Sequence, residues 1–528
     1  MGAIFTLIPI FILVLTALVL IAIRLIRPRS KYYWLLTALG ALLAWLGLLV
    51  SRSSIPYTNS LISWQPDWLG RFTPSLLLDQ YSWSYAVALG TLLLSVILTD
   101  VVRKPEGDWT VWAGSLFLCA LGISAAMAGN PMTLLLFWVA IDLLELLILL
   151  ERYPESHERE KVIIAFSTRL GGSFLLIWAI VYGSTVGEIT TFSQISSQAS
   201  LYLLLAAGLR LGVLPIYVPN LRGLPHNRSL GAIMQMVAAT GGFILLTRTA
   251  LIGVPGSILS FFLFFAAIAA LYGAFSWATS DDEVKGRPFW IVGMGAFALA
   301  SAVRGQALAS LAWGELAILS GGLIFLLSTR NRYLIGLGVL GFLGLTILPY
   351  TPGWNAAALY VQPYNMWFIL LLVAQSIFAA GYLHFVFQSG ENLTGVERWV
   401  WVIYPWGLLL LLVSQYVIAW FEWQANLSLT TLLPGILVCA LMVFWVFFDR
   451  ELSKRPVWLG LSLRIGRAFT FIFSFRWIYR AIWRLYFLLG RLVRLISNIL
   501  EGDGGVLWAL LILVLFIAIL SQFRLGAN

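Results

Sequence analysis

The sequence has little charge: only 11% of its 528 residues are Asp, Glu, Lys or Arg, whereas 60% are hydrophobic. This composition excludes an ordinary soluble domain and indicates an integral membrane protein. Cysteine is also scarce. Cys119 and Cys439 lie far apart in apolar segments, so they predict neither a disulfide framework nor a metal cluster. The three histidines, His157, His226 and His384, are not paired at the spacing of metal ligands.

The motifs of cofactor chemistry are missing as well. The sequence contains no phosphate-binding loop, no dinucleotide fingerprint and no haem-attachment motif. We therefore expect no cofactor, no metal and no catalytic centre of its own. If the chain serves a redox complex, the redox centre is expected in another subunit.

Long apolar runs are what the sequence has in abundance. Each run can cross roughly 30 Å of hydrocarbon, and because backbone polar groups in lipid must pair internally, each is expected to be a helix. About sixteen runs begin near Ala3, Trp34, Ser82, Trp112, Pro131, Val162, Leu201, Ala232, Ile258, Phe289, Ala307, Tyr333, Trp367, Val400, Thr430 and Val506. The predicted fold class is an all-α membrane protein with about 16 transmembrane helices.

The net charge of +10 is explained by orientation rather than by nucleic-acid binding. Basic residues fall in alternate loops, such as "RLIRPRSKYY", "VVRKPEGD" and "STRNRY", whereas the intervening loops are poor in Lys and Arg. Loops rich in basic residues face the cytoplasm. We therefore expect a multi-pass protein of the cell inner (plasma) membrane with both termini on the outer side, and no cleaved signal peptide.

Two segments each place two prolines at the end of an apolar span. The first is Val213–Asn220, with Pro215 and Pro219. The second is Ile347–Asn355, and its prolines are Pro349 and Pro352. Five helices separate the two breaks. A repeat unit with an odd number of spanning helices starts its second copy on the opposite side of the membrane, so the two copies are inverted. Inverted repeats with interrupted helices are typical of ion-coupled transporters.

Six stretches lie in order over about residues 76–390: "LLLDQYSWSY", "LLLFWVAIDLLELLILL", "AFSTRLGG", "SLGAIMQMVAATGG", "AALYGAFSWATSDDEVKGR" and "LPYTPGW". In content and order they resemble one family, the antiporter-like subunits of respiratory complex I, with relatives in multi-subunit cation/proton antiporters and membrane-bound hydrogenases. The resemblance implies partners among other antiporter-like and membrane-arm subunits, together with lipid. It implies no nucleic acid.

The C-terminal part resembles the lateral helix of the largest such subunit. Seven arginines and no acid lie between Pro456 and Leu500. At 100° per residue one face of a helix there carries a basic stripe, as an amphipathic helix in the membrane interface does. The stripe consists of Arg476, Arg480, Arg484, Arg491 and Arg494. The other reading of this segment is a surface helix packed on its own bundle.

The expected organisation follows from these features. Three N-terminal helices occupy residues 1–108, and two inverted five-helix repeats occupy 109–249 and 256–388. Two further helices fill 389–450. The amphipathic lateral helix takes 451–503, and one anchoring helix closes the chain at 504–528.

The resemblance implies a row of titratable side chains across the middle of the membrane. Most of them are missing in this sequence. Val139 stands at the position of the Glu in the fifth helix, and Arg210 replaces the Lys before the first broken-helix proline. Glu315 replaces the Lys of the eleventh helix. The other departures are Ile233 with Gln235 nearby, Ala357 and Gly172. A guanidinium stays charged at any useful pH, so Arg210 is a poor proton relay.

A charge inside a span needs a counter-ion. We expect Arg210 to pair with Asp142 or Glu145, which lie on one face of the fifth helix. Two readings of the acids remain: Asp142, Glu145 and Glu315 form a rebuilt proton pathway, or they only neutralise Arg169, Arg210 and Arg304. The loss at Ala357 favours the second reading.

The function expected from the sequence is that of a divergent antiporter-like subunit of a complex I-related ion-translocating assembly. It supports proton or cation translocation coupled to redox chemistry in other subunits, either as part of the ion pathway or only structurally. One alternative is a stand-alone secondary transporter for a small anion or ion, with Arg210 as substrate ligand. Another is a membrane-embedded transferase, which the shortness of the loops disfavours.

Overall fold

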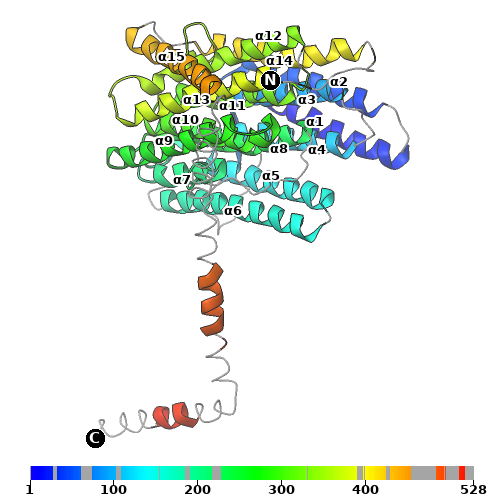
Figure 1. Ribbon diagram of the computed structural model, residues 1–528. Coiled ribbons are helices and arrows are strands. Elements are labelled where there is room, and N and C mark those ends of the chain that lie inside the picture. Colours follow the sequence, from blue (N-terminus) through cyan, green and yellow to red (C-terminus); the bar gives the residue numbers. More distant parts are fainter. Residues whose placement is uncertain are drawn as a thin grey trace. The chain divides into compact units, whose positions relative to one another are not determined.

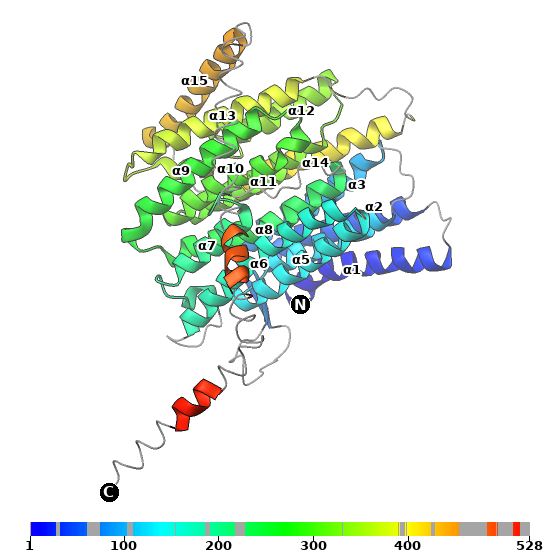
Figure 2. The ribbon, with the colours of Figure 1, turned by 60° about the horizontal axis from the view of Figure 1, so that its bottom comes forward.

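The computed structural model describes most of the chain and divides it into two units, Met1–Thr470 and Phe471–Asn528. The described residues are 2–27, 32–60, 74–102, 109–153, 155–184, 191–216, 228–329, 331–388, 390, 397, 399–423, 428–452, 483–492, 494 and 510–517. The first unit is a bundle of helices that run roughly side by side (Figures 1 and 2).

The helices follow the order of the apolar runs. The bounds are α1 Gly2–Ile26, α2 Tyr33–Ser51, α3 Gln80–Asp100, α4 Trp109–Ala126, α5 Pro131–Arg152, α6 Ser156–Ser184, α7 Ser200–Leu211, α8 Arg228–Ile252, α9 Gly256–Ala278, α10 Glu283–Val303, α11 Ala307–Leu326, α12 Arg332–Phe342, α13 Trp367–Phe387, α14 Val400–Phe421 and α15 Leu429–Leu452. Short 3₁₀ turns are η1 Arg52–Ser54, η2 Phe192–Gln194, η3 Leu343–Thr346 and η4 Trp354–Tyr360.

The bundle has an interior and two rims. Helices α3, α8, α10 and α11 are almost entirely buried, whereas only a third or less of the apolar stretch of α1, α6 and α15 is buried, and each of these helices has several exposed apolar side chains. In Figure 2, α1 and α15 lie on opposite sides of the bundle. An isolated helix with so much exposed apolar surface belongs in lipid or against a partner.

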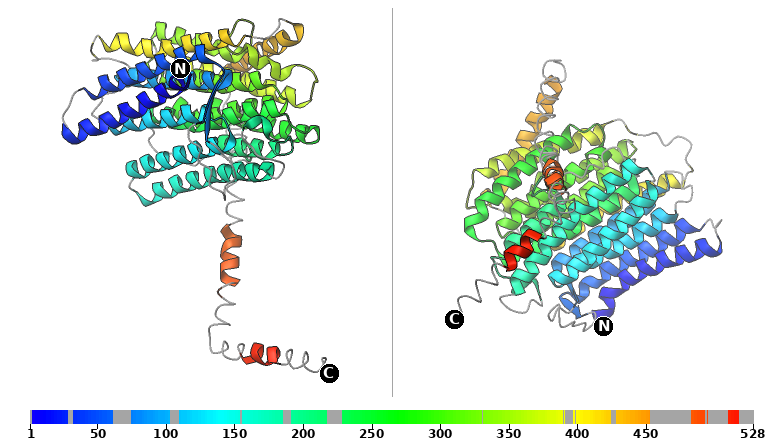
Figure 3. Two further views of the ribbon diagram at one scale, coloured as in Figure 1. Left: turned by 180° about the vertical axis from the view of Figure 1, so that it is seen from behind. Right: turned by 90° about the horizontal axis from the view of Figure 1, so that it is seen from below.

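One small sheet lies outside the helical pattern. Strands β1 Tyr57–Ser60 and β2 Ser75–Leu78 pair in antiparallel register, with Tyr57 opposite Leu78 (Figure 3). Asp79 then caps α3 by accepting a hydrogen bond from the Ser82 amide at 2.9 Å. The sheet therefore leads the chain directly into the buried helix α3.

The number of membrane-spanning helices agrees only in part with the sixteen that the sequence predicts. Within the described residues 13 helices are long and apolar enough to cross a membrane, and two shorter apolar helices are Ser200–Leu211 and Arg332–Thr346. These two are the segments that were expected to be broken. The sixteenth expected span begins at Val506, and only residues 510–517 of it are described, as helix.

The two breaks have different backbone causes. Helix α7 ends because Gly212 adopts the left-handed conformation at φ 72°, after which the Val213 and Leu214 amides both donate to the Gly208 carbonyl. Pro215 follows in this turn, whereas Pro219 lies outside the described residues.

Helix α12 gives way to η3, and Ile347 follows at φ 47°. Tyr350 also has a positive φ, of 62°. Pro349 and Pro352 lie in this irregular stretch, before η4 begins. Both breaks therefore lie where the sequence placed them.

The lateral helix was expected at 451–503. Residues 483–492 and 494 are helical and include Arg484, Arg491 and Arg494, whereas Arg476 and Arg480 lie outside the described residues.

Candidate functional site

Helix α5 sets two carboxylates at the centre of the first expected repeat. Asn130 caps the helix by accepting from the Thr133 amide at 2.8 Å, and Pro131 occupies its first position. Asp142 and Glu145 follow one helical turn apart, and both are buried. Their spacing puts them on one face of α5, toward α6 and α7.

Arg210 lies in the last turn of α7 and binds Asp142 through both terminal nitrogens. The two hydrogen bonds are parallel and each measures 3.0 Å, while Nε donates to the Ala238 carbonyl of α8 at 3.1 Å. The guanidinium carbon also lies 4.4 Å from the centre of the Trp138 ring. Both side chains of the ion pair are fully buried. One arginine thus joins α5, α7 and α8 at the broken helix.

Arg169 of α6 completes the cluster. It forms an ion pair with Glu145, in which its second terminal nitrogen lies 3.1 Å from Oε1, and its first lies 3.9 Å from Asp142. Two arginines and two carboxylates therefore alternate in one buried network, and their formal charges cancel. Because breaking such a pair leaves a buried charge, the network is expected to be fixed rather than readily rearranged.

Gly172 stands where the resemblance implies an Asp, and the structure leaves little room for a side chain there. A Cβ at Gly172 would lie 3.2 Å from the Ala206 carbonyl oxygen and 3.8 Å from the Arg210 Cβ. The missing side chain lets α6 approach the backbone of α7 directly beside Arg210. The departure from the family pattern is therefore matched by close helix packing.

Gly172→Asp should destabilise the protein by about 1–3 kcal/mol, because the added side chain has to push α6 and α7 apart. The measurement is the free energy of unfolding in detergent micelles. Gly336→Ala is the matched control, because a Cβ there meets nothing within 4 Å, and it should be neutral or slightly stabilising. Equal effects at both positions would contradict the packing argument.

Glu315 was expected to neutralise Arg304, and the structure shows that this is wrong. Arg304 follows α10 and donates to the backbone carbonyls of Leu359, Val361 and Pro363. Glu315 instead lies within hydrogen-bonding distance of Glu422, which follows the last residue of α14. The physical reason is that three carbonyl acceptors satisfy a guanidinium without a second charge.

Glu422 and Ser84 are site residues that the sequence did not single out. Ser84 donates its hydroxyl to Glu422, and both are buried. Glu422 stands next to a loop, which makes it look like an ordinary residue of the membrane boundary. The sequence did contain one signal for Ser84. It belongs to the "SWS" motif at the start of α3, shortly after the capping residue Asp79, and this helix is buried in the bundle.

Asp79, the residue that caps α3, has a charged partner in the interior of the bundle. It is bound by Arg248 of α8, with one nitrogen–oxygen distance of 2.9 Å. Burial alone would raise the pKa of Asp79, but the Arg248 guanidinium and the hydrogen bonds from Arg248 and Ser82 outweigh it and lower that pKa. Asp79 therefore serves as a counter-ion and a helix cap.

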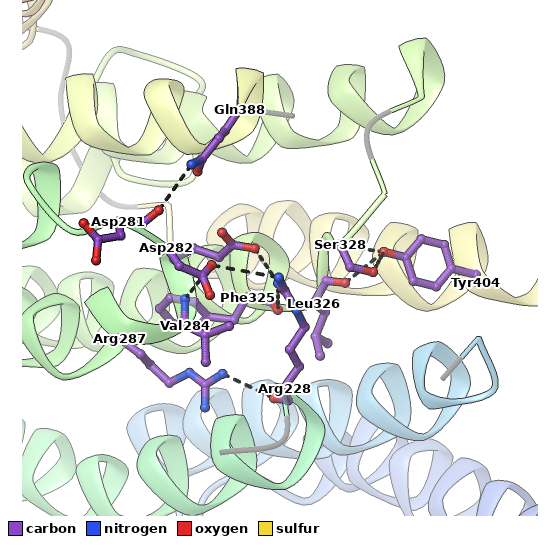
Figure 4. A network of polar contacts seen from close by, with 11 residues as sticks. Arg228, Asp281, Asp282, Val284, Arg287, Phe325, Leu326, Ser328, Gln388 and Tyr404 are labelled. Atoms are coloured by element: carbon purple, nitrogen blue, oxygen red, sulfur yellow. Dashed lines mark hydrogen bonds and ion pairs between the residues drawn. The ribbon is translucent and has the colours of Figure 1, made fainter. Parts of the chain in front are cut away.

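A polar network joins the helices at the opposite end of the bundle (Figure 4). Arg228, the first residue of α8, forms an ion pair with Glu283, and its terminal nitrogen lies 3.9 Å from Asp282. Arg287 donates to the Arg228 carbonyl at 3.4 Å. Nearby, Tyr404 of α14 donates to the Leu326 carbonyl at 2.9 Å. These contacts tie α8, α10, α11 and α14 together.

The remaining departures from the expected pattern are apolar, and two of them are buried. Ile233 lies in α8, and Ala357 lies in η4, the second half of the broken helix. Val139, in α5, is likewise unable to carry a proton. Within the described residues, no three His, Cys, Asp or Glu side chains are placed to hold a metal ion.

No model of a known protein family matches the sequence, and no curated protein matches it. Solved structures do match. One is a chain of the membrane-bound sulfane sulfur reductase, an archaeal respiratory membrane complex, with a TM-score of 0.70 and 15% identity over 96% of this chain and 99% of that one.

Two further complexes contain similar chains. A chain of the Mrp complex from Dietzia sp. DQ12-45-1b has a TM-score of 0.74 and 13% identity, over 98% of this chain and 63% of that chain. This chain therefore spans less than two thirds of that one. A chain of respiratory complex I from Thermus thermophilus has a TM-score of 0.58 and 16% identity, over 82% of this chain and 99% of that chain.

Identities this low establish the fold alone. The chain is a multi-pass membrane protein, and its fold is that of the matching chains in these three complexes.

Proposed function

We propose that this chain is a divergent antiporter-like subunit of a complex I-related ion-translocating assembly, and that its contribution in the first repeat is structural. The observation that carries the proposal is the bidentate Arg210–Asp142 pair at the broken helix. A lysine there could lose its proton and pass it on, but a guanidinium held by a carboxylate stays charged.

The element order supports the proposed inverted repeat. Helices α4 to α8 and α9 to α13 form two sets of five, and the fourth helix of each set, α7 or α12, is the short broken one. The assembly would supply redox chemistry and neighbouring subunits, and this chain would supply a fixed scaffold between them. The inner (plasma) membrane, with both termini on the outer side, remains the proposed location.

The contacts of Arg210 disfavour the stand-alone anion transporter. Both terminal nitrogens are bound to Asp142, and Nε is bound to the Ala238 carbonyl. A substrate anion would have to displace Asp142, which would leave two negative groups near one cation in a buried site. Arg210 therefore has the geometry of a structural counter-ion rather than that of a substrate ligand.

The test is capture of the full chain from its native membranes, followed by identification of the proteins that remain bound. We expect membrane-arm subunits of one complex, in constant ratio to the captured chain. If the basic stripe binds neighbouring subunits, a variant that lacks residues 456–528 should retain these subunits in an amount at least about ten-fold lower. Recovery of a monomer with uptake activity would contradict the proposal.

A further inference from the structure

The first turn of α8 binds acidic residues on two sides. Arg228 forms an ion pair with Glu283 at the start of α10, and its other terminal nitrogen lies 3.9 Å from Asp282 (Figure 4). The next residue, Ser229, donates its hydroxyl to Asp100, the last residue of α3, at 2.5 Å. Two successive residues therefore connect the last helix of the first expected repeat to the second repeat and to the N-terminal helices.

The Arg228 guanidinium lies between the ends of two other helices. One terminal nitrogen is 3.4 Å from the Phe325 carbonyl oxygen in the last turn of α11, where a positive charge is favoured. Asp282 caps α10 by accepting from the Val284 amide at 3.4 Å, and Glu283 follows in the first turn, where a negative charge is favoured. Arg228 is therefore attracted by both helix ends at once.

Aromatic rings lie behind these charges, toward the interior. The Arg287 guanidinium carbon is 5.1 Å from the centre of the Phe325 ring, which packs edge to face on Trp277 at 5.9 Å. Exposure falls in the same direction: the side chain of Arg228 is 18% exposed and that of Glu283 5%, whereas Arg287 is 1% exposed and both rings are fully buried. The ion pair therefore forms the outermost layer, and the rings behind it exclude water.

We propose that these contacts form a clamp that keeps this end of the bundle closed to water, and that the Arg228–Glu283 pair is the part that closes it. The apolar spans of α8, α10 and α11 are almost entirely buried, and the clamp joins the ends of these three helices. When the pair breaks, the starts of α8 and α10 separate and water reaches the next turn. The clamp is independent of the proposed function, because it requires no partner subunit and no transported ion.

The neighbouring charged residues have weaker or uncharged contacts. Lys285 lies 3.4 Å from Asp281, but both side chains are largely exposed, and an exposed pair contributes little. Asp100 is held by two uncharged donors, the Ser229 hydroxyl and the Trp112 indole nitrogen, the latter at 3.1 Å. Among the described residues, the ion pairs of the first residue of α8 are therefore the charged link between the two expected repeats at this end.

The test is the rate at which a buried thiol reacts with a water-soluble maleimide, on the full chain in lipid nanodiscs. Cys119 and Cys439 are first replaced by Ala, and Ala232→Cys then places one thiol in the second turn of α8, at a fully buried position. A buried thiol reacts only when the structure opens locally. We expect Arg228→Ala to raise the rate at least about ten-fold, and Glu283→Gln to raise it less because Gln keeps the side-chain shape.

Ala250→Cys is the matched control position, because it is buried in the same helix near its other end. Its rate should not change in Arg228→Ala. Lys285→Ala should leave the rates at both positions unchanged. Arg228→Ala combined with Glu283→Gln should react no more than about two-fold faster at position 232 than Arg228→Ala alone, because both substitutions break the same pair.

Three results would overturn the proposal. The first is an unchanged rate at position 232 in Arg228→Ala. The second is equal acceleration at positions 232 and 250, which would show general loosening of the bundle. The third is an effect of the double variant equal to the product of the two single effects. If Arg228→Ala does not fold, Glu283→Gln decides in its place, and an unchanged rate at position 232 in that variant overturns the proposal.

Discussion

Arg210→Ala should lower the free energy of unfolding by about 3–5 kcal/mol, because it leaves Asp142 charged and buried with its main partner gone. The side chains of both residues are fully buried, and Arg169, at 3.9 Å, is too distant to replace two 3.0 Å hydrogen bonds. The substitution also removes the contact with Trp138 and the donor to the Ala238 carbonyl. The measurement is denaturant unfolding in mixed micelles, together with the midpoint of thermal unfolding.

The double variant Arg210→Ala with Asp142→Asn should recover part of this loss, because the orphaned charge is removed. Lys285→Ala is the control for loss of an exposed pair: Lys285 lies 3.4 Å from Asp281, both are largely exposed, and the change should cost no more than about 0.5 kcal/mol. If Asp142→Asn gives no recovery, the Arg210–Asp142 pair is not what stabilises the bundle.

The partner of Arg210 could be predicted because a buried charge leaves few choices. The sequence offered Asp142 and Glu145 on one helix face, and the structure places Asp142 on Arg210 and Glu145 on Arg169. Residue spacing alone could not separate the two acids, since they are one turn apart on α5. The choice depends on how α6 and α7 pack against α5, which the local sequence pattern does not state.

The partners of Ser84 and Arg304 could not be predicted in the same way. Glu422, which accepts a hydrogen bond from Ser84, stands beside a loop, so nothing in the local pattern marks it as buried. Arg304 binds backbone carbonyls, which every residue has and which leave no trace in the sequence. Matching charges by residue type therefore located the acids that bind Arg210 but could not find the partners of Arg304.

Proline was an incomplete guide to the broken helices. Pro9, Pro288, Pro405 and Pro434 lie inside helices that continue through them. Neighbouring helices in a bundle can satisfy the backbone groups that a proline frees, so a single proline does not end a span. At the real breaks the chain also adopts a left-handed residue, Gly212 or Ile347. The paired prolines located these sites, whereas the backbone turn defines them.

Arg304→Ala should lower the free energy of unfolding by about 2–4 kcal/mol and loosen the second broken helix specifically. The Arg304 side chain donates to the Leu359 carbonyl in η4 and to two carbonyls in the segment that joins η4 to α13, and its guanidinium carbon lies 4.6 Å from the Phe368 ring centre. Without it, these carbonyls lose a charged donor and the segment loses its tie to α10. Hydrogen exchange should become faster in residues 354–368.

Arg304→Lys separates charge from geometry. A lysine keeps the positive charge but cannot present the planar fork that reaches several carbonyls at once, so about half of the loss should remain. Arg332→Ala is the control, because Arg332 is exposed at the start of α12 and its removal should leave exchange in residues 354–368 unchanged. Faster exchange spread evenly over α4 to α8 would show that Arg304 supports the whole bundle, and would contradict its assignment to the second break.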